Sequence, residues 1–326
     1  RFITEEEAST RYDSVHNIIT VNKDFTTEWV VEQKQTLLNE SARENMKLLR
    51  LYYSVDFEAI EVLDAHIKNT TIEPVDKALI EDKNLASQAI GFTDTRQISI
   101  PFKNVQVGSQ VSLKYKRTTK KPMLKDHFSI RLHYGEGGYW QNSTTTIFSQ
   151  IPLYWYSNDP NNSLKINTSK KDDVYHYTIE LIKPITTQTT NEPANSLLNE
   201  SLETWVSFST DNTWAQFGKK LTDKYEAIVS QPLPEKFIKA VEAAKKHEQD
   251  ADKINHITAF IQDQIRYLGD WKTTEKGFYP RAIATIIETQ YGDCKDFSTL
   301  TVAMLRAMGF KAKFAIVTRG EMINAY

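Results

Sequence analysis

Cysteine is almost absent from this chain, which has one, Cys294, among 326 residues. An internal disulfide is therefore excluded, and Cys294 has no second thiol with which to share a metal ion. The seven histidines are scattered along the sequence. We therefore expect no metal site and no other cofactor. One cysteine is compatible with either a reducing or an oxidising compartment.

Long apolar runs and a strong charge of one sign are also missing. No stretch approaches the ~18 apolar residues of a membrane-spanning helix, so we expect no transmembrane segment in this sequence. Lys and Arg number 40 and Asp and Glu 42, for a formal net charge of −2. This balance gives no broad attraction to nucleic acid or anionic lipid. The basic cluster at residues 114–125 is expected to be a solvated strand and turn, with a polyanion contact as the alternative.

Hydrophobic residues make up 40% of the chain, enough for two sizeable cores and hence two or three domains. Residues 11–183 contain short runs rich in Val, Ile, Tyr, Phe and Thr, separated by turn residues, which predict an all-β domain. The expected strands are residues 14–21, 26–35, 49–56, 59–67, 96–101, 110–117, 144–151, 164–168 and 174–181. A polar stretch rich in Thr and Pro, residues 184–196, predicts a linker.

The remaining sequence has mainly helical periodicity. Residues 204–209 predict a strand, and helices are expected at residues 214–228, 234–247, 252–268 and 281–288. We therefore predict a β-sandwich at residues 1–183, a linker with a connecting strand at 184–211, and a helical α+β domain at 212–326.

The most informative stretch is residues 291–297, which place Cys294 at the expected start of an amphipathic helix. Apolar side chains follow at three- and four-residue steps, and Gly309 provides a C-terminal stop. Asp293 is a suitable N-cap, and Asp296 three residues later gives a pattern like a capping box. Cys294 is therefore expected at the first helical position.

That position suits a nucleophile. Unpaired backbone N–H groups and the positive end of the helix dipole favour a thiolate over a thiol, and Lys295 adds a nearby cation. The same N–H groups could bind the oxyanion that forms when a thiolate attacks a carbonyl. The alternative is that Cys294 is a small core residue, as a lone cysteine in line with an apolar helical stripe usually is.

These residues resemble the transglutaminase-like core of bacterial proteins. The resemblance rests on Tyr-Gly-Asp-Cys-Lys-Asp at 291–296, the Leu- and Met-rich helix after it, an expected strand at 311–318, and two upstream segments, Asp-Gln-Ile-Arg-Tyr at 263–267 and Tyr-Pro-Arg-Ala at 279–282. It covers about residues 214–318. It implies a papain-like α+β core with a Cys-His-Asp triad, of which only the cysteine, Cys294, can be assigned.

The other members of the implied triad have no counterpart in this sequence. All seven histidines precede Cys294, although the family's histidine normally follows the cysteine. We therefore expect that the chain is a cut or processed piece whose core stops before the His and Asp, in keeping with its start on Arg1. His247 and His256, on predicted helices, are better interpreted as surface or capping residues than as the catalytic base.

Aromatic residues near the cysteine are further candidates. Trp271, Tyr279 and Tyr291, together with Asp293, could line a substrate groove or help to stabilise an oxyanion, because relatives of this fold often place an aromatic residue near the nucleophile. For each aromatic residue the alternative is packing in a small core.

Two features of the β part have open interpretations. Trp140, Tyr154, Trp155 and Tyr156 could form a platform for a ligand or carbohydrate, although packing between sheets is the default for aromatic residues on strands. The glycine-rich segment at residues 135–138 lacks the helix and the Lys-Ser/Thr of a phosphate loop, and we predict an ordinary loop.

The β part also resembles a bacterial β-sandwich domain of unknown function that commonly precedes transglutaminase-like cores. The matching stretches are a hairpin at residues 11–37, a turn leading into a strand at 102–111, and residues 147–152. The expected fold is thus multidomain α+β, with an N-terminal antiparallel β-sandwich followed by a helical, partial transglutaminase-like core.

Together the resemblances imply a bacterial protein exported to the periplasm or cell surface. The implied reaction is attack of Cys294 on an amide of a protein or peptide substrate to give a thioester, with transfer to water, as in a cysteine protease, or to an amine. The alternative is a catalytically silent binding or scaffolding protein whose β-sandwich recognises a cell-surface or protein partner.

Overall fold

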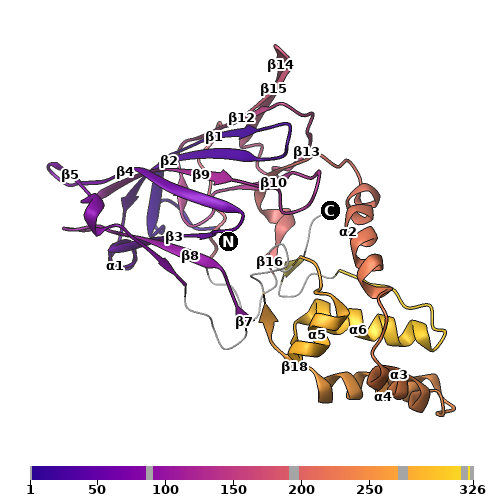
Figure 1. Ribbon diagram of the computed structural model, residues 1–326. Helices are drawn as coiled ribbons and strands as arrows, with labels where there is room; N and C mark the ends of the chain where they lie inside the picture. Colours follow the sequence, from indigo (N-terminus) through magenta and orange to yellow (C-terminus); the bar gives the residue numbers. More distant parts are fainter. Residues whose placement is uncertain (1, 86–90, 191–197, 271–277, 317–321, 324–326) are drawn as a thin grey trace. The chain divides into compact units, whose positions relative to one another are not determined.

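The computed structural model describes residues 2–85, 91–190, 198–270, 278–316 and 322–323. The chain divides into two compact units (Figure 1). Unit 1 contains residues 1–84, 95–212 and 318–326, and unit 2 contains residues 85–94 and 213–317. Unit 1 is built from strands and unit 2 mainly from helices, which confirms the multidomain α+β class.

The largest sheet in the described part of unit 1 has nine strands. Its order is β14-β15-β12-β1-β2-β9-β4-β5, and β11 also pairs with β1. Among these strands only the pairings of β1 with β11 and with β12 are parallel. The strands are β1 (Thr10–Val21), β2 (Thr27–Leu37), β4 (Glu58–Lys68), β5 (Ile72–Pro74), β9 (Gln110–Thr119), β11 (Tyr139–Trp140), β12 (Ser143–Ser149), β14 (Leu164–Lys171) and β15 (Val174–Leu181).

Two three-stranded sheets accompany the large sheet among the described strands, in the orders β10-β17-β13 and β3-β8-β6. They comprise β3 (Leu48–Ser54), β6 (Glu81–Asn84), β8 (Thr95–Pro101), β10 (Ser129–Tyr134), β13 (Tyr154–Asn158) and β17 (Thr204–Ser209). Unit 1 also contains α1 (Glu40–Met46), the 3₁₀ turns η1 (Lys77–Leu79) and η2 (Glu200–Leu202), and the short pair β16 (Leu198–Asn199) and β21 (Met322–Ile323).

The described hydrophobic residues of unit 1 form two clusters on the same face of the large sheet. One joins β1, β12 and β15 to β10 and β17, and the other joins β4 and β9 to β3 and β8. Val15 is paired with Gln33, Gln33 with Leu113, and Leu113 with Ala65. Directly paired residues point to the same side of a sheet, so this row connects the two clusters across one face.

The strand predictions agree with the observed strands to within a few residues. The expected connecting strand is β17, which pairs with β10 and β13. In the expected linker, Ile185 bridges to Trp140, and residues 191–197 lie outside the described residues.

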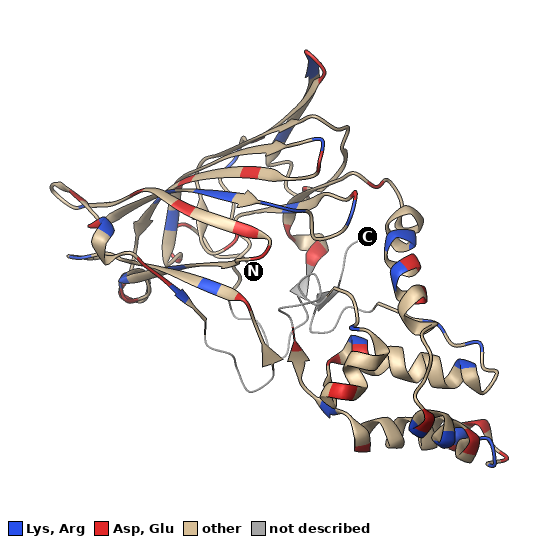
Figure 2. Cartoon of the chain, in the orientation of Figure 1, with Lys and Arg blue, Asp and Glu red and all other residues tan. Residues whose placement is uncertain are grey.

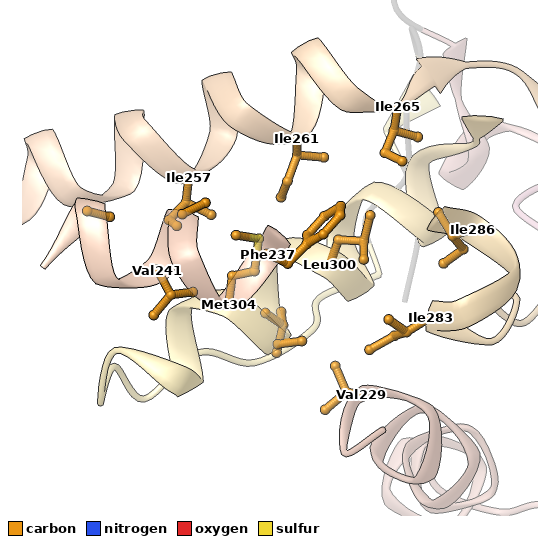
Figure 3. Packing of buried hydrophobic residues seen from close by; sticks show 14 residues of the cluster. Val229, Phe237, Val241, Ile257, Ile261, Ile265, Ile283, Ile286, Leu300 and Met304 are labelled. Carbon is orange, nitrogen blue, oxygen red and sulfur yellow. The ribbon is translucent and has the colours of Figure 1, made fainter. Parts of the chain in front are cut away.

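Unit 2 contains the helices α2 (Trp214–Val229), α3 (Glu235–Ala244), α4 (Asp250–Gln264), α5 (Ile283–Thr289) and α6 (Cys294–Ala307). Each contributes to one hydrophobic cluster, in which Leu300 and Met304 of α6 meet Phe237 of α3 and Ile261 of α4 (Figure 3). Two short parallel pairs complete the described unit: β18 (Arg266–Tyr267) with β20 (Tyr291–Gly292), and β19 (Gly269–Asp270) with β7 (Gly91–Phe92).

Two predictions for unit 2 are wrong. The helix expected at residues 252–268 ends at Gln264, because Ile265 leaves the helical conformation and the chain continues as β18. The strand expected at residues 311–318 is absent from the described residues 311–316. A strand requires a ladder partner. Here the Ala312 carbonyl instead accepts a hydrogen bond from Arg306, and the Phe314 ring packs against Tyr225.

Acidic and basic residues are interspersed in both units (Figure 2). Within the described ranges, no helix has the length and apolar character needed to cross a membrane. The same ranges contain no group of three or more His, Cys, Asp or Glu residues arranged to hold a metal ion.

We predict that Ile147→Ala destabilises the protein by about 2–5 kcal/mol, because Ile147 is 0% exposed and its truncation leaves a cavity in the first cluster. Urea denaturation followed by circular dichroism measures the change. The control is Ile18→Ala on the neighbouring strand, where the side chain is 51% exposed and the expected loss is below about 1 kcal/mol. Equal losses would contradict the assignment of the core face.

Candidate active site

Cys294 is the first residue of α6, as the sequence predicts, and it is exposed. Asp293 is the N-cap, and the capping box with Asp296 is complete, since each side chain accepts from the backbone N–H of the other residue. The exposure of Cys294 rules out the alternative of a core cysteine. The buried stripe of α6 begins instead with Asp296, Thr299 and Leu300.

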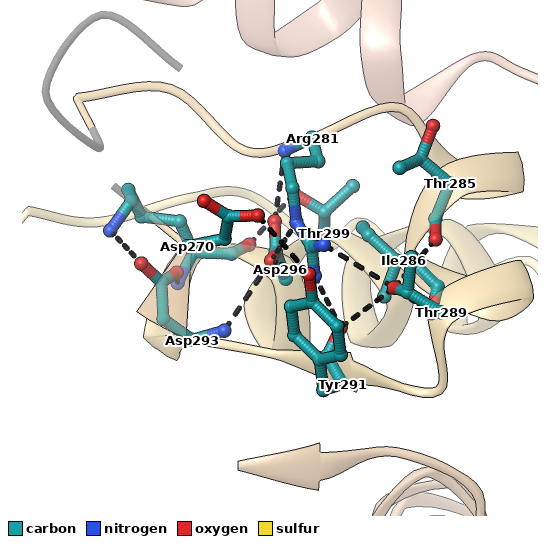
Figure 4. A network of polar contacts seen from close by, with 10 residues as sticks. Asp270, Arg281, Thr285, Ile286, Thr289, Tyr291, Asp293, Asp296 and Thr299 are labelled. Atoms are coloured by element: carbon teal, nitrogen blue, oxygen red, sulfur yellow. Dashed lines mark hydrogen bonds and ion pairs between the residues drawn. The ribbon is translucent and has the colours of Figure 1, made fainter. Parts of the chain in front are cut away.

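A buried ion pair fixes the start of this helix (Figure 4). The Asp296 carboxylate accepts from the Arg281 backbone N–H at 2.8 Å and from its guanidinium Nε at 2.9 Å. Both side chains are at most 5% exposed. Burial raises the pKa of Asp296 above its ordinary value, and the hydrogen bonds and charge of Arg281 oppose that shift.

Arg281 also joins the helix to the segment before it. Its guanidinium donates to the Tyr291 carbonyl and to the Thr289 hydroxyl, and it lies 4.5 Å from the centroid of the Tyr291 ring. Gly292 permits this close arrangement, because a Cβ at that position would lie 2.6 Å from the Cβ of Asp296. The identities of Arg281, Gly292 and Asp296 therefore depend on one another.

The structure adds Tyr267 to the site. The pairing of β18 with β20 sets Tyr267 opposite Gly292, two residues before the cysteine. Its hydroxyl lies close enough to Cys294 for the thiol and backbone N–H of that residue to influence the pKa of Tyr267. Partial burial, followed by the nearby Cys294 and Asp293, raises the pKa of Tyr267. The ring packs near Phe297, 5.7 Å between centroids, and remains 60% exposed.

Sequence reasoning missed Tyr267 because the apolar pattern placed it inside a helix. The signal that could have found it is the Ile-Arg-Tyr segment itself, in which a β-branched and an aromatic residue favour a strand.

The cap leaves few free donors at the helix start. The backbone N–H groups of Lys295 and Asp296 bind the Asp293 carboxylate, and the Lys295 ammonium lies 2.5 Å from the same carboxylate. The charge of Lys295 is therefore largely balanced by Asp293. The Cys294 N–H, which lies near the Tyr267 hydroxyl, is a first-turn donor that the cap does not use.

The other candidate residues have separate positions. The Tyr291 hydroxyl donates to Asp270 at 3.1 Å, and its ring contacts the edge of Phe92. Tyr279 is 5% exposed and packs against Tyr225, with the Lys224 ammonium over its ring. Trp271 lies outside the described residues.

Tyr225 is a buried neighbour of the site. Its hydroxyl donates to the Phe278 carbonyl at 3.0 Å. Burial, together with the nearby acidic groups of Asp293 and Cys294, raises its pKa to about 12, so it stays neutral at physiological pH.

His247 and His256 face each other, with 3.2 Å between their ring nitrogens. Neither has a hydrogen bond or ring contact with Cys294 among the described residues. His247 lies just after α3, and His256 lies within α4.

Unit 1 is built from strands, and unit 2 contains a buried helix that begins at an exposed cysteine, as expected for a transglutaminase-like core. Residues 238–323 match the transglutaminase-like superfamily. Residues 23–186, half of the chain, match the domain of unknown function DUF3857. The chain belongs to the DUF3857 family, and both resemblances are confirmed.

Among solved structures, one titled "putative protease" from Parabacteroides distasonis has a TM-score of 0.74 and 17% sequence identity. The match covers 92% of this chain and 59% of that one, so the present chain spans about three fifths of its length. This likeness establishes a shared fold. A zinc metallopeptidase from Deinococcus radiodurans matches at 8% identity over 61% of this chain and 42% of that one, with a TM-score of 0.32, too low to indicate a common fold. No curated protein matches the chain.

We predict that Arg281→Met destabilises the protein by about 3–5 kcal/mol at neutral pH, because it leaves the Asp296 carboxylate buried and unpaired. Without the guanidinium, the pKa of Asp296 in the folded state rises further above its unfolded value. The deficit is therefore largest at neutral pH and shrinks as the pH falls through that raised pKa and the carboxylate is protonated. Urea denaturation at a series of pH values measures both effects.

The matched control is Arg306→Met, which removes a pair with Glu226 of which both members are about a third exposed or more. We expect a loss below about 1 kcal/mol from that ion pair. A deficit for Arg281→Met that is no larger than the control, or that grows as the pH falls, would refute the role given to the buried pair.

Proposed function

We propose that Cys294 is the nucleophile of an amide hydrolase or acyltransferase that acts on proteins or peptides. The observation that carries the proposal is an exposed thiol at the first position of a capped helix, beside the Tyr267 hydroxyl. The transglutaminase-like superfamily match supports it.

The reaction proceeds in two steps. The Cys294 thiolate attacks the amide carbonyl, the carbon–nitrogen bond breaks, and the amine leaves with a proton while a thioester forms. Water then attacks the thioester to release a carboxylic acid, or an amine attacks to give a new amide, and the thiol is regenerated. Hydrolysis is the outcome we favour, as the sequence resemblance implies.

The oxyanion of each tetrahedral intermediate needs fixed donors. The candidate donors are the Cys294 N–H and the nearby Tyr267 hydroxyl, because the cap already binds the next two N–H groups. A preorganised pair of donors in this position stabilises charge that develops during attack. Among the described residues, no histidine has a hydrogen bond or ring contact with Cys294. We therefore take the general base to be the His of the superfamily triad, which is not assigned to a residue here.

Export to the periplasm or cell surface stays a prediction from the resemblance. The competing function is a binding or scaffolding protein with a silent cysteine core. The two are separated by the reactivity of the thiol, because a structural cysteine needs no activation.

We predict that iodoacetamide alkylates Cys294 faster than a thiol placed elsewhere on the same helix, since the thiolate is the reacting form and the helix N-terminus favours it. Intact-mass spectrometry at one neutral pH gives the two rates. We expect Cys294 to react about 2- to 5-fold faster.

The matched control is the double variant Cys294→Ser with Ser298→Cys, which moves the thiol one turn along α6 to another exposed position. If both proteins are alkylated at the same rate, activation by the helix start is rejected and the silent-core alternative is favoured.

We further predict that Tyr267→Phe slows acylation of Cys294 by p-nitrophenyl acetate by roughly 10²-fold or more, the effect of removing one oxyanion donor. Release of p-nitrophenolate measures the rate. Tyr291→Phe is the control, because its hydroxyl binds Asp270, and its rate should stay near that of the wild type. Unchanged acylation in Tyr267→Phe would remove Tyr267 from the mechanism.

A further inference from the structure

A second candidate site lies within unit 1, and its lining includes none of the residues assigned to the chemistry of Cys294. A cavity of about 430 Å³ opens on the covered face of the large sheet, lined by β1, β2, β9, β10 and β12 and by the segment from Glu136 to Trp140. We call it the aromatic cleft and define it by Tyr12, Trp29, Gln33, Tyr115, Arg131 and Trp140. Its volume is in the range of small-molecule sites, ~300–1,000 Å³.

The floor of the aromatic cleft is a row of paired residues on neighbouring strands. Thr145 pairs with Asn17, Asn17 with Val31, and Val31 with Tyr115. All four residues line the cavity. The floor therefore sits on the interior of the sheet, where the ladder on either side holds the backbone in place.

The two indole rings of the aromatic cleft are held by their own hydrogen bonds. The Trp29 Nε1 donates to the Asn17 side chain at 2.9 Å, and the Trp140 Nε1 donates to the Glu136 carbonyl at 2.9 Å. The Trp140 ring also packs against Tyr12, 5.4 Å between centroids. Because their N–H donors are satisfied within the protein, the indoles offer a ligand fixed apolar surface.

The glycine-rich loop explains how Trp140 is placed. Gly137 has φ +75°, and a Cβ there would lie 3.3 Å from the Tyr12 hydroxyl. A Cβ on Gly138 would lie 2.5 Å from the Thr10 carbonyl oxygen. Only glycine permits the loop to approach β1 this closely, and the loop in turn provides the carbonyl that orients Trp140.

The basic residues of the aromatic cleft are paired with acidic residues of the protein, and the acidic residue Glu136 lies near Tyr12. The Arg131 guanidinium binds Glu200 at 2.9 Å and stacks 4.2 Å from the centroid of Trp205, and His133 lies 3.3 Å from Glu203. A strongly charged ligand would therefore meet no unbalanced opposite charge on these groups.

Three uncharged polar groups of the aromatic cleft remain available. Within the described residues, the Tyr12 hydroxyl, the Tyr115 hydroxyl and the Gln33 amide make no hydrogen bond to other protein groups. Hydroxyl and amide groups can both donate and accept hydrogen bonds, so they match ligand hydroxyls, which also do both.

We propose that the aromatic cleft binds a neutral saccharide. A sugar ring packs its C–H face on an aromatic ring and presents hydroxyls around its edge, which fits fixed indoles beside uncharged donor-acceptor groups. A proline-rich peptide would also pack on the aromatic rings, but its carbonyls only accept hydrogen bonds and would use these groups less fully. The proposal is independent of the function assigned to Cys294.

The test is titration of the whole chain with cellobiose, maltose and N,N′-diacetylchitobiose, followed by tryptophan fluorescence and isothermal calorimetry. Decaproline is titrated in parallel. We expect saturable binding of at least one disaccharide and none of decaproline.

Variants then locate the binding. Tyr115→Phe removes one hydroxyl and keeps the ring, and we expect it to weaken binding roughly 2- to 10-fold. Trp140→Ala should weaken it by about 30-fold or more, as for a buried aromatic anchor. The matched controls are Tyr156→Phe and Trp155→Ala, on exposed residues of β13 that do not line the cavity, and they should bind as the wild type does. Thermal denaturation checks that each variant is folded.

Three results would overturn the proposal. They are failure of all three disaccharides to bind, binding of decaproline in their place, and loss of saccharide affinity in the β13 controls with none in Tyr115→Phe. Because none of these readouts involves Cys294, they leave the hydrolase proposal to its own test.

Discussion

The ion pair between Arg281 and Asp296 is the interaction on which the rest of the cysteine site depends. Asp296 closes the capping box of α6 and at the same time binds the backbone and guanidinium of Arg281. Arg281 in turn holds the Tyr291 carbonyl, and therefore the short strand that precedes the cap. Because burying either charge alone is unfavourable, the two residues must be satisfied together, and their geometry fixes the direction of the helix that presents Cys294.

The thiol is consequently exposed at the surface while the helix beneath it is buried. Leu300 and Met304 are fully buried further along α6, so the helix cannot turn to expose a different face without losing that packing. The Lys295 ammonium contributes little to stabilising a Cys294 thiolate, because it is paired with Asp293. What remains is the helix start itself and the Tyr267 hydroxyl.

In unit 1, packing on one face of the large sheet leaves a cavity. Two hydrophobic clusters occupy one face of the nine-stranded sheet, and the aromatic cleft opens on that face where β1, β2 and β9 run side by side. Trp29 contributes to the packing of the first cluster and Tyr115 to that of the second. The aromatic residues of the cleft thus have a packing role as well as a surface available to a ligand.

Local signals in the sequence determined most of the elements and the place of the cysteine. The alternating strands, the amphipathic helices and the cap formed by Asp293 and Asp296 are each specified by residues a few positions apart, so they could be predicted without a fold. Tertiary structure alone decided the rest. Tyr267 reaches Cys294 through a parallel pairing with β20, Arg281 finds Asp296 across a loop, and Trp140 joins Trp29 in a cleft rather than the other aromatic residues of its predicted platform. These contacts join residues that are distant in sequence, and no local pattern encodes which strands or loops will be neighbours.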